Sequence, residues 1–135
     1  MPKRESMGVS ATMGSAAVDK DVQFVEEFVS AVPGFADVYD AHMAENHEVL
    51  PYVIFWNITQ ETVLSFVRKT AEPPDWEAVL RFLEKRFESG ESEVRSLIIT
   101  AFLGYLPFPD QPGHDIVNHL GAALKAQFDM MRPRG

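Results

Sequence analysis

The four histidines are the side chains in this sequence that could most readily bind a metal ion. His42 and His47 are five residues apart, and so are His114 and His119. Helical metal pairs need a spacing of three or four, whereas residues five apart point about 140° away from each other on a helix with 100° per residue. We therefore expect no metal site and interpret the histidines as ordinary surface or half-buried residues. Better-spaced neighbours, which could share a hydrogen bond or supply half of a site, are Glu45 or Asn46 for His42, and Asp115 for His119.

The sequence contains no recognisable arrangement of catalytic residues. The chain has no cysteine and no Gly-x-Ser-x-Gly, Walker-type or dinucleotide-binding glycine motif. Glu45 and Glu48 have the spacing of a carboxylate pair, but such pairs arise by chance in a chain with 20 acidic residues, and a solvated helix face explains them better. We therefore expect that the protein is not an enzyme and that it needs no cofactor.

The negative charge is concentrated in one third of the chain. The formal net charge is -8, and the 47 positions from 21 to 67 contain eight acidic residues and no Lys or Arg, so the rest of the chain sums to zero. A field of this sign repels nucleic acid phosphates and anionic membranes, and it attracts basic proteins. We expect a basic protein partner, no nucleic acid and no membrane. The eight acids are Asp21, Glu26, Glu27, Asp37, Asp40, Glu45, Glu48 and Glu61.

Three aromatic residues, Tyr52, Phe55 and Trp56, lie within the same acidic span. Residues of these types most often fill a core. Tyr and Trp are also enriched among the residues that dominate binding energy at protein interfaces. On the second interpretation one of these residues anchors a partner that the acids attract. The candidate partner-binding residues are Asp37, Asp40, Glu45, Glu48, Tyr52 and Trp56.

Helical periodicity runs through most of the chain and predicts an all-α fold that positions these side chains. The clearest pattern starts at Ser92 and continues to Leu106, with Ile98 and Phe102 at the centre of the expected core. Three further helices are bounded by residues that typically begin or end a helix. They run from near Asp19 to Pro33-Gly34, from about Phe35 to Asn46-His47, and from Trp76 to Ser89 with Asp75 as the N-cap. The last helix is expected from about Asp115 to Met131.

Positions 51–69 allow two interpretations. Pro51 suits the first turn of a short helix that ends at Trp56, because its missing N–H would be unbonded there. A second helix, capped at Asn57 or Thr59, would then run to about Lys69. The competing interpretation is a strand at 52–58, where aromatic and β-branched residues are dense.

Five to seven helices joined by short breaks predict stacked antiparallel hairpins or a bundle. Residues 1–18 are small and polar without a period, so we expect a flexible N-terminal leader followed by a single helical domain at 19–135. No segment approaches the roughly 18 consecutive apolar residues of a spanning helix, and the leader lacks the large apolar residues of a good signal peptide. We therefore expect a cytoplasmic protein.

Two resemblances bear on fold and function. The pair of helices at 76–89 and 93–106 resembles one unit of a HEAT-type repeat, because the second opens with Ser92-Glu93-Val94-Arg95; no second copy recurs at a fixed period. The order of features along 22–106 resembles a bacterial family of small acidic helical domains of unassigned function. Similar proteins occur as immunity partners of secreted toxins. The features are Phe35-x-x-Val38-Tyr39, Glu48-x-Leu50-Pro51-Tyr52-Val53, Leu83-Glu84, Gly90-Glu91-Ser92-Glu93-Val94 and Phe102-Leu103-Gly104-Tyr105-Leu106.

The resemblance transfers no catalytic residue and implies a protein-binding role. The first hypothesis is therefore a binding protein, such as an immunity protein, whose acidic region caps a basic toxin or nuclease domain. The alternative is a helical adaptor or structural domain whose acidity only aids solubility. A small enzyme with an unrecognised site is the third hypothesis, and the oligomeric state is left open.

Overall fold

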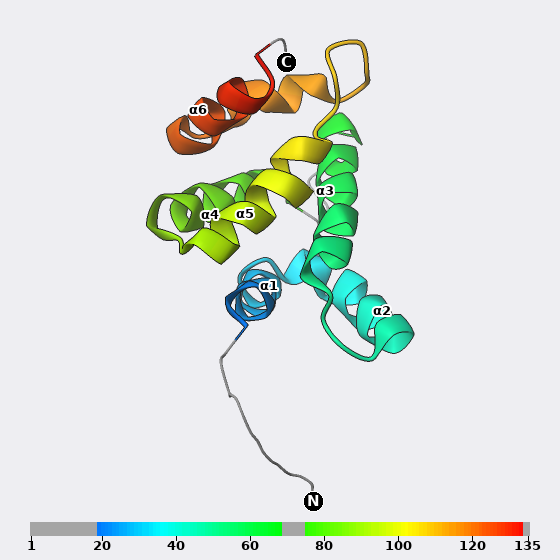
Figure 1. The fold of residues 1–135 in the computed structure, drawn as a ribbon. Coiled ribbons are helices and arrows are strands. Elements are labelled where there is room, and N and C mark those ends of the chain that lie inside the picture. The colour runs from blue at the N-terminus through cyan, green and yellow to red at the C-terminus, as the bar shows by residue number, and fades with distance from the viewer. Residues whose placement is uncertain (1–18, 69–74, 134–135) are drawn as a thin grey trace, which may run out of the picture.

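The described residues form six α-helices and three short 3-10 helices without a β-strand, which confirms the predicted all-α class (Figure 1). The structure is a computed structural model that describes residues 19–68 and 75–133. The predicted leader at 1–18, and positions 69–74 between two of the predicted helices, lie outside these residues. The elements are α1 (Lys20–Ala31), η1 (Pro33–Phe35), α2 (Ala36–Asn46), α3 (Pro51–Arg68), α4 (Trp76–Ser89), α5 (Ser92–Ala101), η2 (Leu103–Tyr105), η3 (His114–His119) and α6 (Ala122–Met131).

The longest helix, α3, is the axis around which the other elements are arranged (Figure 1). α1, α4 and α5 pack along one side of it, α6 packs on α4, and α2 packs against its N-terminal part. α4 and α5 are joined by only two residues and pack against each other. The side of α3 turned away from α4 and α5 is covered by no described helix along most of its length. This arrangement leaves one long helical face open to solvent.

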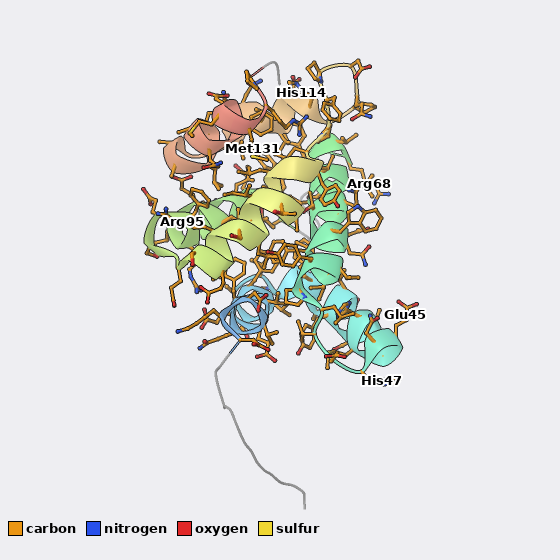
Figure 2. The ribbon with its side chains drawn as sticks, in the orientation of Figure 1. Glu45, His47, Arg68, Arg95, His114 and Met131 are labelled. Carbon is orange, nitrogen blue, oxygen red and sulfur yellow. The ribbon has the colours of Figure 1, made fainter. Side chains whose placement is uncertain are left out.

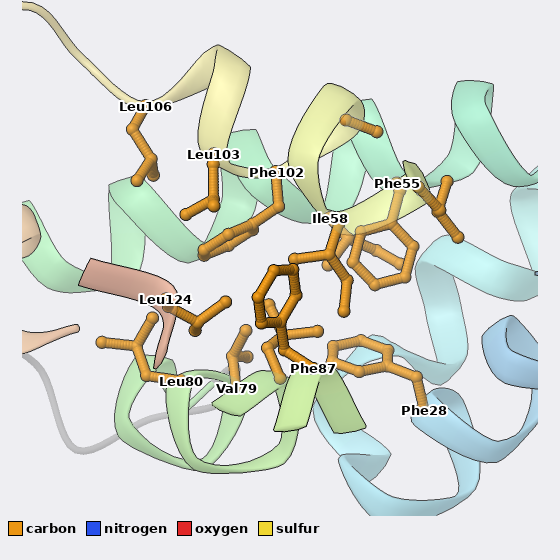
Figure 3. Packing of buried hydrophobic residues seen from close by; sticks show 14 of the residues in the cluster. Phe28, Phe55, Ile58, Val79, Leu80, Phe87, Phe102, Leu103, Leu106 and Leu124 are labelled. Atoms are coloured by element: carbon orange, nitrogen blue, oxygen red, sulfur yellow. The ribbon is translucent and has the colours of Figure 1, made fainter. Parts of the chain in front are cut away.

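The core lies between α3 and the helices stacked beside it. Figure 3 shows Phe28, Phe55 and Phe102 pointing into this space from α1, α3 and the turn after α5. The Phe28 ring lies 5.2 Å from Phe55 and 5.4 Å from Phe35, centroid to centroid, in the tilted geometry that aromatic pairs prefer. Ile98 and Phe102 are both 0% exposed, which confirms their predicted place at the centre of the core.

α3 is one continuous helix of 18 residues, so the predicted break near Asn57 and the alternative strand at 52–58 are both wrong. Its buried side includes hydroxyl residues, which a search for apolar residues passes over. Thr59 Oγ1 donates to the carbonyl of Phe55 at 2.8 Å, and Thr62 Oγ1 donates to the carbonyl of Ile58 at 2.7 Å. These bonds satisfy the hydroxyls within the helix and let the inner face continue past Asn57 without a break.

The helix predicted from Ser92 to Leu106 ends early, at Ala101. Phe102 departs from helical geometry (φ -114°, ψ -68°), and a 3-10 turn follows it. Tyr105, expected on the buried stripe, is therefore exposed. The guanidinium of Arg132 holds this turn, because its Nη1 donates to the carbonyl of Leu106 at 2.7 Å.

The last predicted helix divides into the 3-10 helix η3 and the α-helix α6, which Gly121 separates. Glu84 explains the new helix start. Its Oε2 accepts from the backbone N–H of Ala123 at 2.9 Å, and its Oε1 accepts from that of Leu124 at 3.0 Å. A Cβ on Gly121 would lie 2.4 Å from the Glu84 carboxyl carbon, so a larger residue there would displace this carboxylate from the start of α6. A carboxylate from another helix thus does the work of the N-cap side chain.

Candidate functional site

α2 carries three of the candidate acids on its solvent side. Asp37, Asp40 and Glu45 are all exposed, and Figure 2 shows Glu45 at the outer end of the helix, far from α4 and α6. The opposite side of α2 presents Tyr39 and the almost fully buried His42 to α1 and α3. The helix is therefore held by its inner face, and its acids are turned toward solvent as predicted.

His42 fixes the corner between α2 and α3. Its Nε2 accepts a hydrogen bond from the backbone N–H of Leu50 at 2.9 Å, so this nitrogen carries no proton. Asn46, one of the two neighbours with suitable spacing, donates through Nδ2 to the backbone carbonyl of His42 at 3.0 Å. His47 ends α2 in the left-handed conformation (φ 64°) and turns the chain back. Glu48, in this corner, is exposed beside the start of α3.

The four candidate acids are unpaired, which distinguishes them from the acids of α1. Asp37, Asp40, Glu45 and Glu48 make no ion pair with any described residue. Their carboxylates are therefore free to act on a partner. The structure brings all four to α2 and the corner that follows it.

The acids of α1 interact with the protein itself. Glu27 forms an ion pair with Arg86 of α4. Glu26 accepts from the Tyr39 hydroxyl at 3.4 Å. Burial, and then the charge of Glu26, raise the pKa of Tyr39 above its ordinary value, which keeps this hydroxyl protonated as a donor. The acidic span of the sequence therefore divides into a structural part on α1 and a free part on α2.

The three aromatic candidates on α3 do not share one environment. Phe55 is 0% exposed and stacks against Phe24 with the ring centroids 5.6 Å apart, so it belongs to the core and cannot anchor a partner. Tyr52 and Trp56 are 43% and 45% exposed. The expectation that such residues fill the core holds for Phe55 and fails for the other two, which lie on the open side of the helix beside the acidic corner.

Three further exposed apolar residues on α3 were missed by the sequence analysis. They are Val53, Leu64 and Val67. The sequence contained a signal for them, because apolar residues lie on more than one side of α3, whereas a helix with a single buried face needs apolar residues on that face only. The predicted helix break at Asn57 concealed this distribution.

A hollow of about 520 Å³ lies between α4 and the segment before α6. Of its polar lining residues, Glu84 is engaged with the backbone of α6. His119, whose spacing would allow a hydrogen bond to Asp115, makes edge-to-face ring contacts, with centroids 5.0 Å from Trp76 and 5.5 Å from Phe66. These side chains therefore hold α3, α4 and η3 together. Within the described residues, no three His, Asp or Glu side chains are placed to hold a metal ion.

Comparison with known proteins places these features in one family. A family model with the description "Domain of unknown function (DUF7674)" matches residues 25–132. This range includes the α2 acids and the whole of α3. No curated protein and no solved structure matches the chain. Among the helices that the structure describes, none has the length and apolar character to cross a membrane.

Proposed function

The chain belongs to the DUF7674 family of domains of unknown function, and we propose that it is a protein-binding domain that engages a basic partner through α2 and the start of α3. One observation carries this proposal: four exposed acids without an ion partner among the described residues adjoin two half-exposed aromatic side chains. The proposed contact residues are Asp37, Asp40, Glu45, Glu48, Tyr52 and Trp56.

The charge distribution favours a binding role over solubility alone. Solubility is served by acids spread over the surface, whereas concentrating them raises the local field and speeds encounter with a basic partner. Some acids elsewhere in the protein form ion pairs within it, as Asp129 does with Lys125 and Glu91 with Lys20. The acids of α2 form no such ion pair with a described residue, so their clustering needs another explanation.

The aromatic residues favour a protein as the partner. Charged contacts at the rim of an interface mainly determine association rate, and affinity depends on a few buried anchors. Tyr52 and Trp56 offer large apolar surfaces with polar tips at the edge of the acidic corner. Their exposure has no explanation from packing within the described chain.

The most specific form of the proposal is an immunity protein that caps a basic toxin or nuclease domain. A nuclease must bind phosphates with Lys and Arg, and a cluster of carboxylates presents charges of the same sign as those phosphates. The resemblance to small acidic immunity proteins points in the same direction. The alternative adaptor or structural role would leave the acids to aid solubility only.

The test is capture of proteins by three forms of the chain, followed by mass spectrometry. One form is the native chain, one carries Asp37→Lys, Asp40→Lys and Glu45→Lys, and a control carries Glu77→Lys, Glu88→Lys and Glu93→Lys. Both variants change the net charge from -8 to -2, since three reversals add six charges. The native and control chains should retain a common basic protein that the α2 variant loses. Equal retention by all three folded forms would contradict the proposal.

A further inference from the structure

Five exposed apolar residues lie along the outer side of α3 in two groups, at 52–56 and at 64–67, with the half-buried Gln60 and Val63 between them. These five residues are called the stripe below. With 100° per residue, they fall within an arc of about 120° on the helix, and no charged residue lies inside this arc. A helix of this length extends over about 27 Å. The stripe residues are Tyr52, Val53, Trp56, Leu64 and Val67, each at least 40% exposed.

The two ends of the stripe have different surroundings. At its start lie the acidic corner with Glu48 and the acids of α2. At its end, the loop before η3 packs closely, because a Cβ on Gly113 would lie 2.8 Å from Val63 Cγ1 and 3.1 Å from Val67 Cγ2. Between this loop and the helix is a hollow of about 360 Å³. α3 ends with the exposed Arg68 (Figure 2). This end carries both signs of charge, because Asp115 lines the hollow and Arg68 lies nearby on the helix. A partner lying along the stripe therefore meets a purely acidic surface only at the α2 end.

We infer that the stripe is the docking surface for a single amphipathic α-helix of the partner protein, with the basic end of that helix against α2. The inference rests on the proposed function, which supplies the basic character of the partner. A long, straight and narrow apolar face fits a helix with apolar residues at i, i+3, i+4 and i+7. The hollow at the loop accepts an apolar side chain from its other end.

The charge of the chain favours this occupant over a second copy of the protein. Two copies that meet through α3 bring together two molecules of net charge -8, with all of that charge in the 21–67 span that contains the stripe. A helix rich in Lys or Arg at one end instead brings opposite charge to the acids. The charge pattern thus favours a basic partner helix over a second copy, and it places the basic end of that helix against α2.

The test uses synthetic helical peptides of about 18 residues, the length of α3. The first peptide has Leu on one face and Lys in its first two turns. The second replaces Lys with Gln, and the third scrambles the first so that Leu is spread around the helix. Each is titrated into the isotopically labelled full chain and followed by amide chemical shifts. The first peptide should bind along 52–67, the second more weakly, and the scrambled peptide should not bind.

Two variants of the chain locate the contact. Val53→Gln with Leu64→Gln removes apolar surface from the stripe, and Met130→Gln removes a comparably exposed residue on α6. Gln maintains helix propensity, so both variants should remain folded by circular dichroism. The stripe variant should weaken binding of the first peptide by about tenfold or more, and Met130→Gln by less than about twofold.

The outcomes separate this inference from the proposed function. Binding that is lost in the stripe variant but is the same for the first and second peptides would contradict the basic partner and support helix docking. Failure of every peptide to bind, or equal binding by the stripe variant, would overturn the docking helix and leave capture through the α2 acids untouched. A dimer in sedimentation experiments that Leu64→Gln dissociates would overturn it in favour of a second copy.

Discussion

The two ends of the molecule use charged residues in opposite ways. Around α6, charged side chains hold backbone segments together. Glu84 accepts from two N–H groups at the start of α6, and Arg132, just beyond its end, donates to the carbonyls of Leu103, Leu106 and Pro107. The guanidinium of Arg132 also lies 4.2 Å from the Phe108 ring centroid, and burial lowers its pKa from the ordinary value. These charges are part of the structure.

Around α2 and the start of α3 the charged side chains have no such role. The four acids of this region point to solvent without an ion partner among the described residues, next to Tyr52 and Trp56. From this comparison we expect that the charges of α2 can be changed without affecting the fold. The comparison also identifies one surface on which contacts within the described residues explain neither the exposed acids nor the exposed aromatic side chains.

The largest expected effect concerns the core that both regions share. Phe102→Ala should lower the free energy of unfolding by about 3–5 kcal/mol, because it removes a fully buried ring and leaves a cavity. Against a typical total of about 5–15 kcal/mol, this is a large fraction. Urea denaturation measures it, with the exposed Tyr105→Ala as the control. A loss below about 1 kcal/mol would show that the core is not centred on this residue.

The next effect tests the region around α6. Glu84→Ala should cost about 1–2 kcal/mol, since it leaves two N–H groups at the start of α6 without their carboxylate. The expected result by urea denaturation is a lower midpoint with an unchanged slope. Hydrogen exchange should accelerate at Ala123 and Leu124 in particular. Stability equal to the native value would mean that solvent replaces the carboxylate without cost.

The matching change in the α2 region should leave the fold intact. Replacing Asp37 and Asp40 with Asn and Glu45 with Gln should alter the free energy of unfolding by about 0.5 kcal/mol or less, because these acids are exposed and unpaired. Thermal denaturation of this variant beside Glu84→Ala gives the comparison directly. A destabilisation as large as that of Glu84→Ala would remove the distinction between the two regions.

The smallest effect is a pH dependence at the contact of α1 with α2. The folded-state pKa of Tyr39 is raised, first by burial and then by Glu26. The contribution of the protonated Tyr39 hydroxyl to the free energy of unfolding is therefore fully present below the unfolded pKa of about 10, and it is lost as pH rises through the folded pKa. Stability should fall more steeply above pH 10 in the native chain than in Tyr39→Phe. Parallel pH profiles would place Tyr39 in a more solvated environment than the structure shows.

Much of the fold could be predicted because local signals and tertiary contacts agree. Pro33 and His47 end helices where expected, and Asp75 caps α4 by accepting from the N–H groups of Glu77 and Ala78. The prediction errors lie where residues that are distant in the sequence determine the ends of the helices. At the end of α5, the Ala101 carbonyl lies 2.7 Å from the Thr59 hydroxyl of α3, and Arg132, 26 residues from Leu106, holds the turn that follows. The start of α6 is held by Glu84.

The surroundings of the candidate residues could be predicted in part. Charged side chains on a helix surface are ordinarily exposed, so the exposure of Asp37, Asp40 and Glu45 could be expected from the sequence. The adjacent residues Phe55 and Trp56 could not be distinguished, because their preferences are similar and only the rotation of α3 against the core separates them. The rotation places Thr59 and Thr62 on the inner side of the helix, and apolar periodicity alone does not indicate that these two residues face inward.

Association kinetics with the captured partner decide the claim that the α2 acids form a functional surface. We expect Asp37→Lys, Asp40→Lys and Glu45→Lys together to lower the on-rate by about tenfold or more in 0.15 M salt, and the control variant with Glu77→Lys, Glu88→Lys and Glu93→Lys to leave it nearly unchanged. The difference should shrink as the Debye length falls from about 8 Å at that salt to about 3 Å at 1 M. An equal on-rate for the two folded variants would contradict the claim.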